Sequence, residues 1–158
     1  MPRKHIANES LIDSVAQNLF LALPIFRKRL LHMDVIQREF NVPLSHVQVM
    51  AMLNDNGSMN VSEISRRLGI AKPNITPLID RLIEDRYVER KRDENDRRMV
   101  NVNICPLGVS RLQEIRAKMR EIVGEWANAL NSSELRELNE SLKNINQVLG
   151  STLQNNHE

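Results

Sequence analysis

One stretch of the chain predicts a β-hairpin: Val88-Glu-Arg-Lys-Arg-Asp-Glu-Asn-Asp-Arg-Arg-Met-Val-Asn-Val-Asn-Ile104. The returning arm, Val100–Ile104, alternates apolar residues with asparagines, which is the period-two pattern of a half-buried strand. The outgoing arm carries the cations Arg90, Lys91 and Arg92, and a charged tip separates the two arms. Such a hairpin can extend positive charge beyond a small domain towards a polyanion such as DNA. A solvated surface hairpin would show the same pattern.

Two helices are predicted directly before the hairpin. The first covers Val61–Gly69, with Gly69 at the position where a helix stops, and the second covers Lys72–Arg86. A tight turn that holds a glycine between two such helices is the helix–turn–helix arrangement, whose second helix enters the major groove of DNA. A hairpin directly after it makes a winged helix. Apolar residues three and four positions apart form the expected buried face of the second helix: Ile75, Leu78, Ile79, Leu82 and Ile83.

Composition narrows the classes of protein and partner. The 158 residues carry a formal net charge of only +2, so the placement of cations matters more than their total. Aromatic residues make up 3%, which disfavours the stacking platforms that bind single-stranded nucleic acids. The single cysteine excludes an intramolecular disulfide and suits a reducing cytoplasm. Because neither a membrane span nor a signal peptide is recognised, we expect a cytoplasmic protein.

Long helices are predicted at both ends of the chain, in residues 1–40 and 107–158. Apolar residues recur there three and four positions apart, which is the narrow seam of a helix that packs on other helices. Pro24 is expected to kink the N-terminal helix, and Ser132 or Ser133 is expected to cap the last helix.

These helices do not fit inside a compact winged helix and therefore predict a homodimer. A two-fold axis would present two recognition helices to DNA half-sites about 34 Å apart. An intramolecular bundle beside the winged helix is the alternative. We divide the chain accordingly into an N-terminal dimerisation helix (1–40), a winged helix–turn–helix DNA-binding lobe (41–106) and C-terminal dimerisation helices (107–158).

Five short motifs follow one another along residues 40–108. The combination of an Asp-x-Arg wing with a Leu-x-Asp-Arg-Leu helix at this distance is more specific than a helix pair alone. The motifs are Leu44-Ser45 with Gln48; Ser62-Glu63-Ile64 with Leu68-Gly69-Ile70; Leu78-Ile79-Asp80-Arg81-Leu82; Tyr87-Val88-Glu89-Arg90; and Asp96-Arg97-Arg98 with Val100, Val102, Ile104 and Gly108.

In these motifs the chain resembles the multiple-antibiotic-resistance regulator (MarR) family of bacterial transcription factors. The resemblance implies a mainly α-helical fold with a small β-hairpin wing, and a dimer whose N- and C-terminal helices intertwine. It also implies a repressor that releases DNA when a small organic effector binds between the dimer helices and the winged helix.

Two positions depart from the family pattern. Members of the family usually have Leu-Thr ahead of the helix that follows the wing, whereas this chain has Ile104-Cys105-Pro106. Pro106 suits the first turn of a helix, and Cys105 takes the place of a hydroxyl cap and is a poorer one. Pro77 lies about one turn inside the recognition helix, where it removes a backbone hydrogen bond and is expected to bend the helix or shift its start.

The recognition helix is expected to read bases through its N-terminal residues, Lys72 to Thr76, which include Pro73. Lys72 can reach guanine or phosphate, Asn74 can pair with adenine, and Thr76 can touch a thymine methyl group. Phosphate contacts or ordinary solvated charges are the two interpretations of Arg66, Arg67 and Arg81.

By the resemblance, Arg98 is the wing residue that enters the minor groove, where a narrow A·T-rich sequence attracts an arginine. Asp96 would orient Arg98, and Arg97 and Arg92 would contact the DNA backbone. Ser45 either meets a phosphate or simply caps its helix.

The sequence says less about regulation. The four histidines are scattered, so we expect no metal site, and Cys105 lies at the wing exit rather than near the first helix, where the family places its peroxide-sensing cysteine. For an organic effector, Arg27 is the candidate that would face a carboxylate; a surface arginine beside plain core residues is the alternative. The apolar candidates that border the family's pocket are Leu23, Phe26, Leu31, Met50 and Met52.

Other classes of function have less support. No glycine-rich phosphate loop, nucleophile elbow or metal-hydrolase motif is present, so we expect neither an enzyme nor a cofactor. A winged helix that docks on an acidic protein instead of DNA is the remaining alternative. The sequence thus predicts a homodimeric regulator, a repressor, that binds a pseudo-palindromic operator in double-stranded DNA.

Overall fold

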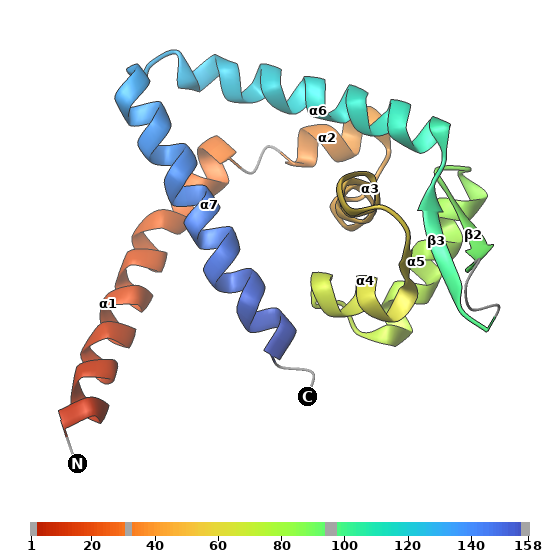
Figure 1. Ribbon diagram of the computed structural model, residues 1–158. Coiled ribbons are helices and arrows are strands. Elements are labelled where there is room, and N and C mark those ends of the chain that lie inside the picture. The colour runs from red at the N-terminus through yellow and green to blue at the C-terminus, as the bar shows by residue number, and fades with distance from the viewer. Residues whose placement is uncertain (1–2, 31–32, 94–97, 156–158) are drawn as a thin grey trace. The chain divides into compact units, whose positions relative to one another are not determined.

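The structure is a computed structural model that describes residues 3–30, 33–93 and 98–155 (Figure 1). It is mainly helical with one small antiparallel sheet, as predicted, and it divides into two compact units, Met1–Val35 and Ile36–Glu158. Among the described helices, none is both long and apolar enough to cross a membrane. The elements are α1 (Arg3–Ile25), the π-helical turn η1 (Phe26–Leu30), α2 (Met33–Phe40), α3 (Leu44–Asn56), β1 (Met59–Asn60), α4 (Val61–Leu68), α5 (Lys72–Glu84), β2 (Val88–Arg92), β3 (Val100–Ile104), α6 (Pro106–Ala127) and α7 (Ser132–Asn155).

The first unit departs from a plain helix near Pro24. This residue lies in the last turn of α1, and the π-helical turn η1 follows directly after Ile25. Proline lacks the N–H that an α-helix needs, and a wider turn is one way to continue the chain past it. The sequence predicted a kink here, and in the described residues the α-helical winding of α1 gives way to the π-helical turn at Phe26.

The turn between α4 and α5 is stabilised by backbone bonds and one buried hydroxyl. Gly69 caps α4 in the left-handed conformation, with φ of 63°, which glycine adopts without strain. The buried Ser65 donates its hydroxyl hydrogen to the carbonyl of Ile70 at 2.6 Å, and the N–H of Ile70 donates to the carbonyl of Ser65 at 3.1 Å. The predicted helix–turn–helix is therefore confirmed.

The recognition helix α5 begins at Lys72 as predicted, so Pro77 does not shift its start. Three residues of its predicted apolar face, Ile75, Ile79 and Leu82, are fully buried, and the other two, Leu78 and Ile83, are half-buried.

This helix ends earlier than the sequence indicated, at Glu84 rather than Arg86. Arg86 takes a left-handed conformation with φ of 60°, and the N–H of Tyr87 then donates to the carbonyl of Leu82 at 2.9 Å. This closure turns the chain directly into β2, which contacts α5.

The predicted hairpin forms the wing, and a third strand joins it. β2 and β3 pair antiparallel (Figure 1). The sheet order is β1-β3-β2. Strand β1, which the sequence analysis missed, pairs Met59 with Val102. Val102 is fully buried, as its place in the alternating arm predicted, whereas Val100 near the tip is 43% exposed.

The sequence predicted the caps of three helices, and the structure confirms one of these predictions and contradicts two. Cys105 caps α6 without a side-chain bond, as expected. The cap of α7 is Asn131, and neither Ser132 nor Ser133 caps the helix. The side-chain oxygen of Asn131 accepts from the N–H of Ser133 at 2.9 Å and from the N–H of Glu134 at 3.0 Å. In return, a carboxylate oxygen of Glu134 accepts from the N–H of Asn131. This reciprocal arrangement is a capping box, and it starts one residue before the serines. Ser45 does not cap α3 either, because Pro43 occupies the N-cap position and no side chain makes a cap bond there.

Candidate nucleic-acid interface

The N-terminal turns of α5 present an exposed surface opposite the core. Lys72, Pro73, Asn74 and Thr76 are all exposed, whereas Ile75 between them is fully buried. The helix turns its apolar side inwards, so every residue predicted to read bases lies on the solvent side. Ala71 caps the helix without a side-chain bond, which leaves this end uncovered by a capping side chain.

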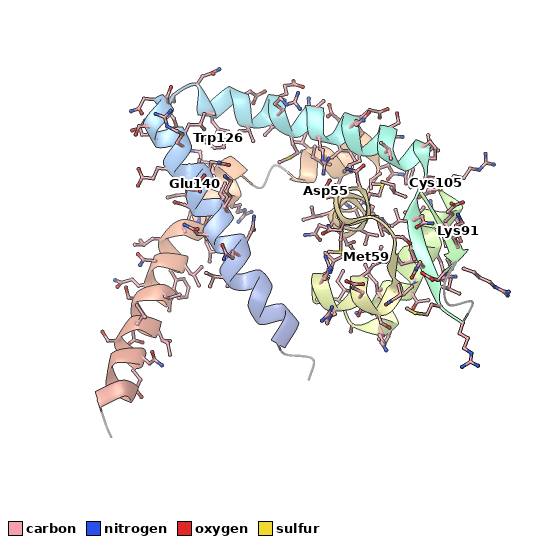
Figure 2. All side chains as sticks on the ribbon, viewed as in Figure 1. Asp55, Met59, Lys91, Cys105, Trp126 and Glu140 are labelled. Carbon is pink, nitrogen blue, oxygen red and sulfur yellow. The ribbon has the colours of Figure 1, made fainter. Side chains whose placement is uncertain are left out.

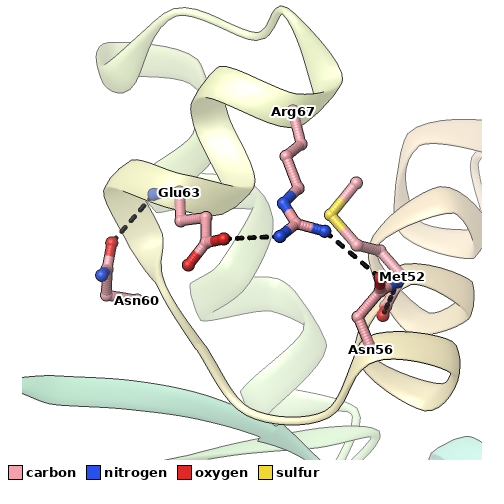
Figure 3. A network of polar contacts seen from close by, with 5 residues as sticks. All are labelled: Met52, Asn56, Asn60, Glu63 and Arg67. Atoms are coloured by element: carbon pink, nitrogen blue, oxygen red, sulfur yellow. Dashed lines mark hydrogen bonds and ion pairs between the residues drawn. The ribbon is translucent and has the colours of Figure 1, made fainter. Parts of the chain in front are cut away.

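The two arginines of α4 differ in their surroundings. Arg66 is exposed. Arg67 is held in a polar network that joins α4 to the end of α3 (Figure 3): its Nη2 donates to Glu63 Oε1 at 2.7 Å and its Nη1 to Asn56 Oδ1 at 3.2 Å. The N–H of Glu63 in turn donates to Asn60 Oδ1 at 2.8 Å, which caps α4. Arg67 therefore has a structural role that the sequence did not indicate.

Arg81 lies at the other end of the recognition helix. It is exposed, and it pairs with Glu84 and Asp85 at 3.3 Å each. These pairs are local to the helix and solvated, so they hold Arg81 only weakly. The predicted phosphate contact remains possible for this side chain.

The wing carries its cations at its outer end. Arg92 ends β2 and Arg98 follows the tip, and both are exposed; Figure 2 marks the neighbouring Lys91 on the same strand. Asp93 steadies the base of the tip, because its N–H donates to the carbonyl of Met99 at 3.0 Å and its Oδ2 accepts from the Asn101 amide at 2.9 Å. Asp96 and Arg97 lie outside the described residues.

One ion pair links the wing to the recognition helix. Arg90 Nη2 of β2 lies 2.8 Å from Asp80 Oδ1 of α5. The pair thus joins the predicted recognition helix to the wing, although both side chains are exposed and the pair adds little to stability. Both residues belong to the short motifs of the sequence, but a separation of ten residues across a helix end and a turn does not predict a contact between them.

A second link that the sequence did not indicate runs from α6 to the base of the wing. Arg111 Nε donates to Tyr87 Oη at 3.1 Å, and its guanidinium lies 5.8 Å from the ring centre of Phe40 and 5.9 Å from that of Tyr87. The bond to Tyr87 raises the pKa of Arg111, so the group stays charged. Arg111 thereby joins α2 and α6 to Tyr87, the residue directly before β2.

The effector candidates are not gathered in one described cavity. Met50 is fully buried in the core, Leu23 and Arg27 are exposed on the first unit, and Leu31 lies outside the described residues. A cavity of about 200 Å³ opens instead between the α2–α3 turn and the C-terminal end of α5, and none of the candidates lines it. Its lining includes Gln37, Asn41, His46, Arg81, Asp85 and Tyr87.

The profile of the MarR family matches residues 42–100. This segment contains the helix–turn–helix, β2 and the start of β3. The match thus covers the interface described above and leaves the terminal helices outside.

Known relatives extend the similarity along the chain. One relative is YsmB of Bacillus subtilis, an uncharacterized HTH-type transcriptional regulator that is 30% identical over 93 residues. These residues cover 59% of this chain and 64% of YsmB, so the match spans just under two thirds of that relative. The HTH-type transcriptional repressor MdtR of Bacillus subtilis is 25% identical over 78% of this chain and 80% of its own. The crystal structure of apo wild-type MarR from E. coli superposes with a TM-score of 0.66 at 19% identity, over 79% of this chain and 93% of MarR, which shows a common fold. These relatives favour a transcription regulator over a protein-docking winged helix.

Proposed function

We propose that this chain is a transcription regulator of the MarR family and that it represses transcription by binding a pseudo-palindromic operator in double-stranded DNA. One observation carries the proposal. The exposed N-terminal turns of α5 and the cationic wing belong to the same compact unit and are joined by the Asp80–Arg90 ion pair. A helix and a basic hairpin held together in this way suit adjacent major and minor grooves.

In this proposal the recognition helix binds in the major groove and the wing binds in the minor groove. Lys72, Asn74 and Thr76 read base edges, and Pro73 lies beside them against the groove. Arg98 enters the minor groove, with Asp96 and Arg97 beside it. Phosphate contacts come from Ser45, Arg66, Arg81 and Arg92. Arg67, the other arginine predicted to contact phosphate, is bound to Glu63 and Asn56 and would have to leave both partners to reach DNA.

A homodimer completes the DNA-binding surface. The apolar residues of α1 are exposed in the single chain, with Leu19 at 56% and Phe20 at 76% exposure. Such a long apolar helix surface requires a partner, and a second copy places a second α5 against the other operator half-site. The protein acts by binding rather than by catalysis, and because bacterial operators lie in the cytoplasm, we place it there.

Release by a small organic effector is the regulatory part of the proposal. Oxidant sensing through Cys105 has less support, since burial raises the pKa of this thiol and reduces the reactive thiolate. The cavity beside α5 is large enough for a small aromatic molecule, and a ligand there would touch the recognition helix at Arg81 and Asp85. Arg27 remains the alternative contact for a carboxylate.

Selection of duplexes from a random DNA pool tests the proposal, with the wild type and Arg98→Ala run in parallel. We expect an enriched two-fold-symmetric site that Arg98→Ala binds more weakly by about 1–3 kcal/mol, with its dimer and melting temperature unchanged. Gln113→Ala, a change at an exposed position on α6 outside the recognition helix and the wing, is the control and should bind like the wild type. Absence of any enriched sequence would contradict the proposal.

A further inference from the structure

The outward face of the first two turns of α5 carries apolar groups as well as polar ones. Pro73 and Pro77 lie four positions apart, with Thr76 beside Pro77, and all three are exposed. Residues three and four positions apart share one side of a helix, so these three side chains lie together. We call them the proline face.

Thr76 contributes a methyl group to this face. Its hydroxyl Oγ1 donates to the carbonyl of Lys72, one turn earlier, at 3.4 Å. A threonine hydroxyl that turns back to its own helix backbone has used its hydrogen there, and the methyl group remains for contacts outside the helix.

Pro77 is placed where a helix normally excludes proline. It cannot donate to the carbonyl of Pro73, so α5 loses one of its hydrogen bonds near its N-terminus. Core packing does not compensate, because the ring of Pro77 is exposed while Ile75 and Ile79 fill the core. The ring must therefore contribute on the outer surface if it contributes to function.

We propose that the proline face reads thymine methyl groups in the major groove, which makes Pro73, Thr76 and Pro77 determinants of operator specificity. This inference rests on the proposed function. Thymine alone offers an apolar group, its C5-methyl, among the edges that the major groove presents, so an apolar patch on a recognition helix matches that base. Proline rings lose almost no rotamer entropy when they contact another group, so little of the contact free energy is lost to ordering the side chain.

Polar neighbours place the contact within the groove. Lys72 precedes the proline face and Asn74 lies within it along the chain, and both are exposed. An asparagine beside an apolar patch suits A·T pairs, because adenine presents its N7 and N6 groups and the paired thymine presents its methyl group. The expected half-site is therefore rich in A·T pairs where α5 lies.

The test replaces thymine with deoxyuridine at each position of the selected operator. Uracil keeps the hydrogen-bonding groups of thymine and lacks only the methyl group. We expect wild-type affinity to fall about fourfold at one or more thymines of each half-site, the size of one lost methyl contact. Pro77→Ala or Pro73→Ala should bind thymine and uracil equally at the affected position.

Controls separate this effect from misfolding and from failure of the proposed function. Pro106→Ala removes an exposed proline from α6 and should discriminate thymine from uracil as the wild type does. Pro77→Ala should melt at the same temperature as the wild type or at a higher one, because alanine favours the helix. Equal wild-type binding of thymine and uracil at every position would overturn the inference and leave the operator intact. Discrimination that survives in Pro73→Ala, Thr76→Ser and Pro77→Ala would also overturn it. If no operator is selected at all, the proposed function fails, and the inference with it.

Discussion

Gly108 occupies a position in α6 where a side chain has no room. A Cβ at this residue would meet the carbonyl oxygen of Tyr87 well inside van der Waals contact, and the side chain of Ile104 lies close as well. The Tyr87 carbonyl accepts from the N–H of Cys105 at 2.8 Å, so it cannot move away without breaking the junction between wing and α6. Absence of a side chain at Gly108 therefore allows this close approach.

Two glycine substitutions in the same helix should have opposite effects. We expect Gly108→Ala to lower the free energy of unfolding by about 1–3 kcal/mol through overpacking. Gly124→Ala, where nothing lies within 4 Å of the new Cβ, should raise it by about 0.5–1 kcal/mol through helix propensity. Urea denaturation of both variants measures this, and an unchanged midpoint for Gly108→Ala would contradict the described contact.

His46 makes folding sensitive to acid. Burial lowers its pKa below 6.5, and Arg81 acts in the same direction while Asp85 opposes it. The unfolded chain therefore binds a proton at a pH where the folded chain does not, so this stabilising contribution is present above pH 6.5 and is lost as the pH falls towards the folded-state value.

Replacement of His46 by glutamine should reduce this sensitivity. Between about pH 7.5 and about pH 5.5 the melting temperature of the wild type should fall more steeply than that of His46→Gln, because the variant has lost one titrating group. Identical slopes for the two proteins would show that His46 titrates alike in the folded and unfolded states.

At the scale of single elements, α4 shows how two adjacent arginines take different roles. The alternation of helix faces leaves Arg66 exposed and brings Arg67 against Glu63 and Asn56. From the sequence, both arginines could equally be phosphate contacts or ordinary solvated charges, because they are the same residue type at adjacent positions. Only the packing of α3 against α4 distinguished them.

Salt dependence of operator binding should separate these roles. Arg66→Gln should reduce the slope of log affinity against log salt by about 0.9, as expected for one lost phosphate contact. Arg67→Gln should keep the slope and lose up to about 1 kcal/mol of stability, because its ion pair is partly exposed. A reduced slope in Arg67→Gln would show that this side chain leaves Glu63 to reach a phosphate.

The elements themselves were predictable where a periodic pattern coincided with a stop signal. α4 ends at the predicted Gly69, and the arms of the wing lie where the alternation of Val100–Ile104 placed them. β1 was missed because two residues, Met59 and Asn60, show no periodicity and form a strand only by pairing with β3. The cap of α7 was assigned to serines because an asparagine one residue earlier is an equally good cap.

At the scale of the whole molecule, the apolar surface of α1 is the feature that a single chain leaves unexplained. Val15, Leu19 and Leu23 follow one another four positions apart and are each more than half exposed. Contiguous apolar surface of this kind marks an interface between proteins.

Charges on α1 should therefore separate the dimer. We expect Val15→Glu/Leu19→Glu to be monomeric in analytical ultracentrifugation and to lose most of its operator affinity, because only one half-site is then occupied. Gln17→Glu adds the same charge on the same helix without removing an apolar group, and it should remain dimeric. A dimeric double variant would place the interface elsewhere.

The sequence by itself determined the class of fold, the positions of α4, α5 and the wing strands, and the resemblance to the MarR family, because these depend on local periodicity, turn residues and short motifs. Tertiary structure alone decided which side chains meet. The Asp80–Arg90 pair, the Arg67 network and the contacts of Arg111 with Phe40 and Tyr87 join residues from separate elements. Such contacts cannot be predicted from local sequence patterns, because they depend on how the elements pack against one another after each has formed.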